Sequence, residues 1–131
     1  MIDVLIVDDH PVVRAGLRAV LGATEDITVV AEAGSAAEAV DIATGSALDV
    51  VLMDLRGFTP QNRGCRYELQ QLLDFVALER VLVLIDADAP RDFIDGTLQT
   101  LWQASRADSP NRAAMPARVR LLEDRGETTV A

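Results

Sequence analysis

The chain has 131 residues, half of them hydrophobic and a quarter charged, which suits one globular domain with its own core and excludes a disordered chain. The formal net charge of −9 repels a phosphate backbone, so we expect no direct nucleic-acid binding by this chain. No apolar run is long enough to span a bilayer, and Asp3 stands where a signal peptide would carry basic residues, so we expect a cytoplasmic protein without membrane contact.

Strands and helices alternate along most of the sequence. Ile2–Val7 is a nearly continuous apolar run, as expected for a strand buried on both faces, and a helix with one apolar stripe follows His10-Pro11. Ser35 and Glu38 form a capping box, which predicts the start of the second helix. The predicted strands are residues 2–7, 27–31, 49–53, 81–85 and 119–122, and the predicted helices are residues 11–22, 35–45, 69–76 and 93–102, with loops at 55–66 and 104–116.

This alternation predicts an α/β fold with a doubly wound parallel sheet. Ligands of such sheets bind outside the carboxyl ends of the strands. Asp8 and Asp9 follow the first predicted strand, Asp54 follows the third, and Asp86 follows the fourth, so we expect these side chains to share one crevice. Clustered carboxylates repel one another unless a cation neutralises them, and the pattern therefore predicts a magnesium-assisted phosphoryl site.

Several segments carry a resemblance to a known family. Val4–Leu17, which contains Asp8-Asp9-His10-Pro11, resembles the opening of response-regulator receiver domains, in particular of the NarL/LuxR-type subgroup. Val29–Ala33, Asp49–Arg56 and Arg80–Leu84 also fit the family's pattern at the expected distances. The resemblance implies a (βα)5 receiver with the flavodoxin-like strand order 2-1-3-4-5, acting in two-component phosphorelay signalling rather than as an enzyme.

The resemblance also assigns roles to residues of the crevice. It implies that Asp54 is the phosphoacceptor. It further implies that Mg²⁺ is held by Asp8, Asp9, Asp54 and the backbone carbonyl of Arg56. A sensor histidine kinase or a small phosphodonor would then be the partner.

Two positions that the family uses for switching are altered. Ile85 stands where the family has a Thr or Ser hydroxyl, and Glu123 stands where it has a lysine. All twelve basic residues of the chain are arginine, so no other position supplies an ammonium group; Arg118 or Arg120 is the alternative source of positive charge. The loop after Asp54 departs from the family as well, and we expect phosphorylation to be weak or lost.

The end of the sequence differs most from the family. We expect a receiver-like domain over residues 1–124 and a short tail over residues 125–131, with the closing helix missing or remodelled and no DNA-binding unit. The loss of that helix would expose apolar surface and favour a homodimer, although a truncated or altered chain is an alternative explanation.

Two other functions compete with a phosphorylated receiver. The first is a receiver-shaped interaction or dimerisation module that works without phosphorylation, which the changes at Ile85 and Glu123 favour. The second is a phosphohydrolase with an Asp-x-Asp motif, and it ranks low because position 56 is arginine.

Overall fold

The structure is a computed structural model that describes residues 1–59, 61, 63–112, 120–123 and 128–130, with the backbone alone described at 123 and 128–130. The helices are α1 (Pro11–Gly22), α2 (Ala36–Gly45), α3 (Arg63–Phe75), the short 3-10 helix η1 (Leu78–Arg80) and α4 (Arg91–Gln103). The strands are β1 (Ile2–Val7), β2 (Ile27–Ala33), β3 (Val50–Asp54), β4 (Val81–Ile85), β5 (Arg120–Glu123) and β6 (Thr128–Val130). Within the described ranges, no helix combines the length and the apolar character needed to cross a membrane.

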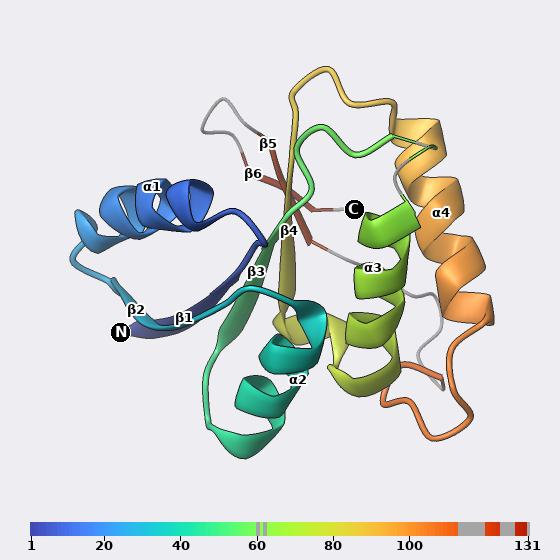
Figure 1. The fold of residues 1–131 in the computed structure, drawn as a ribbon, viewed down its shortest axis with the longest axis horizontal. Coiled ribbons are helices and arrows are strands. Elements are labelled where there is room, and N and C mark those ends of the chain that lie inside the picture. The colour runs from blue at the N-terminus through green and yellow to red at the C-terminus, as the bar shows by residue number, and fades with distance from the viewer. Residues whose placement is uncertain (60, 62, 113–119, 124–127, 131) are drawn as a thin grey trace.

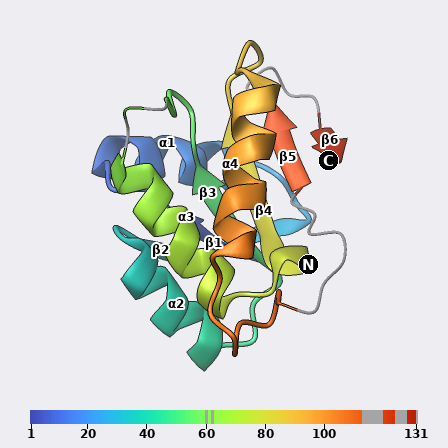
Figure 2. The ribbon, with the colours of Figure 1, turned by 90° about the vertical axis from the view of Figure 1, so that its right-hand side faces the viewer.

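All the strands lie in one sheet with the order β2-β1-β3-β4-β5-β6. The first five run parallel, which confirms the predicted doubly wound fold and the strand order 2-1-3-4-5. Helix α1 covers one face of the sheet, and α2, α3 and α4 cover the other (Figures 1 and 2). β1 and β3 are direct neighbours in this order, and Val7 lies opposite Met53, so the two strands end side by side.

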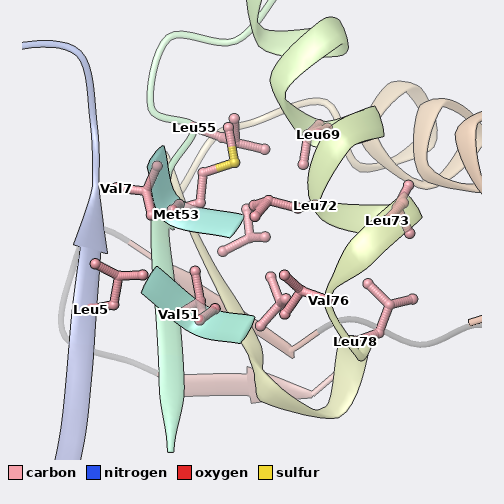
Figure 3. Packing of buried hydrophobic residues seen from close by; sticks show 14 of the residues in the cluster. Leu5, Val7, Val51, Met53, Leu55, Leu69, Leu72, Leu73, Val76 and Leu78 are labelled. Carbon is pink, nitrogen blue, oxygen red and sulfur yellow. The ribbon is translucent and has the colours of Figure 1, made fainter. Parts of the chain in front are cut away.

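The main core lies between the sheet and the three helices α2, α3 and α4. Val51 and Met53 of β3 face Leu72 of α3 and Val76, which directly follows this helix (Figure 3). These four side chains are nearly inaccessible to water, and burying an aliphatic side chain contributes about 1.5–3 kcal/mol. The same packing holds the carboxyl end of β3 rigidly against α3.

The second face of the sheet has a smaller core. Leu17 and Leu21 of α1 pack against it, but no residue of α1 is fully buried. Leu82 and Leu122 on this face are only partly buried, and the part of the chain that the structure describes contains no helix after β5. The strand β6 instead runs antiparallel to β5, at residues where the sequence predicted only a tail.

Several element boundaries differ from the predicted ones, and those of α3, β2 and β3 matter most for the cleft. α3 begins at Arg63, inside the segment that we expected to be a loop up to Arg66, because packing against α2 and the core outweighs the poor helix propensity of Gly64. β2 extends to Ala33, and β3 includes Asp54 as its last residue. Asp54 is therefore held by the sheet itself.

A buried polar cluster anchors the connection after α4. Asn111 is 2% exposed; its Oδ1 accepts a hydrogen bond from the Leu78 N–H (2.8 Å), and its Nδ2 donates to the carbonyls of Leu73 (2.8 Å) and Val76 (2.7 Å). The indole N–H of Trp102 donates to the Asn111 carbonyl (2.7 Å), so Trp102 also helps to hold this connection. The sequence predicted a plain loop here, but residues 105–112 are tied to the end of α3.

We predict that Asn111→Ala lowers the free energy of unfolding by about 2–4 kcal/mol, because it leaves the Leu78 N–H and the Val76 carbonyl buried without their partner. Urea denaturation monitored by circular dichroism measures the change. The exposed α4 residue Gln99 gives the control, and Gln99→Ala should stay within about 0.5 kcal/mol of the parent. Equal effects of the two substitutions would contradict the anchoring role of Asn111.

Candidate functional site

A cleft of about 620 Å³ lies at the carboxyl ends of β1, β3 and β4. Asp8 and Asp9 directly follow β1, Asp54 ends β3, and Asp86 directly follows β4. All four line this cleft, so the structure brings together the acids that the sequence placed at strand ends. The other lining residues come from the same strands, from α1 and its start, and from α3: Val7, His10, Val13, Met53, Arg56, Gly64, Cys65 and Glu68.

Asp8, Asp9 and His10 form a compact group of potential metal ligands. One ligand atom from each of them lies within 4.8 Å of the other two. The backbone N–H of His10 donates to Asp8 Oδ1 (2.7 Å), while His10 Nδ1 lies 3.1 Å from that oxygen and 2.8 Å from Asp9 Oδ1. The Asp8 side chain is 9% exposed and those of Asp9 and His10 are mostly exposed, so the group opens to solvent on one side.

Asp54 has a different electrostatic partner. Its side chain is 5% exposed, and the Arg56 guanidinium binds it through Nη2–Oδ2 (2.7 Å), Nε–Oδ1 (3.0 Å) and Nε–Oδ2 (3.1 Å). The Arg56 backbone N–H also donates to Asp54 Oδ1 (2.9 Å). Within the described part of the chain, no group of three close ligand atoms includes Asp54. No local sequence pattern predicts this pair, because it depends on how the loop after β3 folds.

Mg²⁺ prefers carboxylate oxygens as protein ligands and keeps several water molecules. The carboxylates of Asp8 and Asp9 meet that requirement, and Asp54 lines the same cleft. Both Asp54 oxygens, however, already face the Arg56 guanidinium. The acids therefore fit a magnesium ion at the Asp8–Asp9 end, while Asp54 carries its own cation.

The two residues that the family resemblance marks as altered switch positions lie at the ends of neighbouring strands. Ile85 is the last residue of β4 and is fully buried in the core. Because its side chain is a hydrocarbon, this edge of the sheet has no hydroxyl group at position 85. Glu123 lies opposite Ile85 in the register between β4 and β5, and its side chain is outside the described residues, as are Arg118 and its surroundings. Asp86 accepts a hydrogen bond from the Gly57 N–H (2.7 Å) and so holds the loop after β3.

Three residues around the cleft were not predicted from the sequence. Arg14 of α1 donates to the backbone carbonyl of Asp8 (2.6 Å) and fixes the turn after β1. Burial raises the pKa of the Glu68 carboxyl, and the charges of Asp9 and Asp8 raise it further, whereas a backbone hydrogen bond from Ala36 lowers it. Burial and the nearby carboxylates, Glu68 foremost, raise the pKa of the Cys65 thiol, which keeps it protonated near neutral pH. The late predicted start of α3 concealed Cys65 and Glu68.

Several known proteins are similar to this chain. Residues 4–64 match the family model of the response regulator receiver domain. The nitrate/nitrite response regulator protein NarP of Escherichia coli K12 is 35% identical over 126 residues, which cover 88% of this chain and 59% of NarP. The transcriptional regulatory protein LiaR of Bacillus subtilis is 39% identical over 124 residues, which cover 87% of this chain and 56% of LiaR.

A solved structure matches as well. The receiver domain of the response regulator NarL from Mycobacterium tuberculosis is 27% identical to this chain, with a TM-score of 0.55; the match covers 75% of this chain and 76% of that one. The chain spans about half the length of the curated relatives that it matches. The chain is therefore similar to the receiver part of longer regulators.

We predict that Glu68→Gln stabilises the protein near neutral pH. Folding raises the pKa of this carboxyl, so its contribution to stability is present below the unfolded pKa and is lost as the pH rises through the folded pKa. The amide removes the charge but can still accept a hydrogen bond from Ala36. Urea denaturation should show a gain below about 1 kcal/mol at about pH 7 that shrinks toward about pH 4.

The matched control for this substitution is Glu25→Gln, at an exposed turn residue between α1 and β2. It should change the stability little at either pH. A gain for Glu68→Gln that persisted undiminished at acidic pH would show that relief of charge is not its cause.

Proposed function

Since the chain belongs to the response-regulator receiver domains of two-component signalling, we propose that it accepts a phosphoryl group on Asp54. In this proposal Mg²⁺ binds near Asp8 and Asp9, and a sensor histidine kinase or a small phosphodonor supplies the phosphoryl group. Ile85 and Arg56 make the reaction slow. The domain occupies residues 1–124, and β6 lies in the short tail at residues 125–131.

One observation supports this proposal above the others. Asp8, Asp9 and Asp54 come from the carboxyl ends of two adjacent parallel strands and line one cleft. The cleft has a volume of about 620 Å³, and its carboxylates lie at one edge of the sheet. The side chains of Asp8 and Asp54 are nearly buried, and burying a carboxylate costs free energy. This burial argues against the alternative that the acids are merely solvated surface groups.

The residues of the cleft would act in defined ways. An oxygen of the Asp54 carboxylate forms the new bond to phosphorus while the donor's bond to phosphorus breaks, and the donor leaves with the electron pair. Mg²⁺ bound in the cleft would neutralise charge on the transferring oxygens. Arg14 holds the backbone at Asp8, and Asp86 holds the loop that starts at Leu55, so both acids keep their positions.

A second function also has a specific observation in its favour. Ile85 is fully buried and has no hydroxyl group that could move in response to phosphorylation. The Arg56 guanidinium already neutralises the Asp54 carboxylate. The absence of a hydroxyl group at residue 85 and the contact of Arg56 with Asp54 favour a receiver-shaped module that binds a partner or a second copy without phosphorylation. The partly buried Leu82 and Leu122 lie on the sheet face that such a homodimer would use.

We predict that acetyl phosphate with Mg²⁺ adds one phosphoryl group to the wild-type chain and none to Asp54→Asn, as measured by intact-protein mass spectrometry. Chelation of Mg²⁺ should slow the modification by at least about tenfold, because a bound cation supplies several kcal/mol of charge stabilisation. The control is Asp88→Asn, at an exposed residue of the loop between β4 and α4, and it should react like the parent.

The same variants separate the two functions. If the wild-type chain stays unmodified at millimolar Mg²⁺, and Asp54→Asn leaves the oligomeric state by light scattering unchanged, the phosphorylated receiver is excluded and the interaction module stands. Modification that is equal in Asp54→Asn and the parent would instead show that another residue is the acceptor.

A further inference from the structure

We propose that Arg56 is a built-in cation for Asp54, which neutralises this carboxylate in the metal-free protein and must leave it before a divalent cation can bind there. The inference rests on the function proposed above and concerns the regulation of the same site. It gives the Arg56 side chain a role of its own, separate from that of its backbone carbonyl.

The first support is the loop that carries Arg56. Leu55 and Phe58, on either side of it, are buried, and the Phe58 ring lies 5.2 Å from the ring of Phe93 in α4. The Leu55 N–H donates to the Leu84 carbonyl (2.8 Å), which continues the contact between β3 and β4. Leu55 and Phe58 are anchored in the core, and Arg56 between them lines the cleft.

The turn at Gly57 completes this arrangement. Gly57 has a φ of +77°, a backbone conformation that glycine adopts without strain, and its N–H donates to Asp86 Oδ2 (2.7 Å). The Gly57–Asp86 hydrogen bond holds the loop directly after Arg56, whose backbone N–H and guanidinium both contact Asp54.

The second support is the charge around Asp54. This side chain is 5% exposed, and a buried carboxylate without a counter-charge is strongly disfavoured. The sequence contains no lysine, so an ammonium group is not available for this purpose. Arginine is the side chain best suited to the task, since its planar fork can contact both carboxylate oxygens at once.

The third support is competition for the same oxygens. The Arg56 guanidinium lies within 2.7–3.1 Å of both Asp54 oxygens, so a metal ion that bound either of them would lie beside a fixed positive charge. Two cations at such a distance repel each other strongly in a partly buried site. Metal binding at Asp54 therefore requires the guanidinium to move, and the cleft beside it offers the space.

The experiment compares the affinity for Mn²⁺ alone, measured through the electron spin resonance signal of the free ion, in the parent, Arg56→Gln and Arg63→Gln. Carboxylate sites bind Mn²⁺ as they bind Mg²⁺. We expect Arg56→Gln to bind Mn²⁺ at least about tenfold more tightly than the parent, because the competing charge is gone. Arg63→Gln removes an equal charge at the exposed start of α3 and should stay within about twofold of the parent.

The outcomes distinguish this inference from the proposed function. Equal affinities of the parent and Arg56→Gln would overturn the role of Arg56 while leaving the metal site in place. If Arg56→Gln bound no Mn²⁺ at millimolar concentration, both proposals would fail. An equal gain in Arg63→Gln would assign the effect to net charge and also overturn the inference.

A second variant keeps the test decisive if Arg56→Gln does not fold. Arg56→Lys retains the positive charge but loses the fork that contacts both oxygens. It should bind Mn²⁺ severalfold more tightly than the parent, and more weakly than Arg56→Gln where that variant folds. No gain in a folded Arg56→Lys would overturn the proposal.

Discussion

A nearly buried carboxylate at the end of a central strand needs a cation beside it. The cleft at the carboxyl ends of β1, β3 and β4 is arranged around this requirement. Asp54 lies at the end of β3, between two neighbouring strands, where water reaches only a small part of it. The loop after β3 supplies the cation as Arg56, and Asp86 fixes the loop. His10 Nδ1 lies close to one oxygen of Asp8 and one of Asp9, which line the same cleft. Acids and their partners thus occur as local pairs along the sheet edge.

Much of the fold could be predicted from the sequence because its signals are local. The apolar runs at Ile2–Val7 and Val81–Ile85 correspond residue for residue to β1 and β4. The capping box at Ser35 was also confirmed, since the Glu38 N–H donates to Ser35 Oγ (3.2 Å). The strict alternation of strands and helices then leaves few topologies, and the positions of Asp8 and Asp54 at neighbouring strand ends follow from the observed one.

The features that could not be predicted depend on contacts between distant segments. The start of α3 is set by packing against α2, while the sequence around Gly64 indicates a loop. Asn111 looks like an ordinary loop residue, yet its partners lie more than thirty positions away along the chain. The contact of Arg56 with Asp54 is local in sequence, but the loop that carries Arg56 is also held by the long-range bond between Gly57 and Asp86. No periodic pattern records such contacts.

The pairing of β6 with β5 affects how the molecule meets its neighbours in a crowded solution. An edge strand presents unpaired N–H and C=O groups that can recruit a strand from another molecule. β6 covers β5 in antiparallel register over three residue pairs, at Arg120–Val130, Leu121–Thr129 and Leu122–Thr128. At this edge of the sheet the outermost strand is then a segment of three residues, which is a poor template for fibre-like growth.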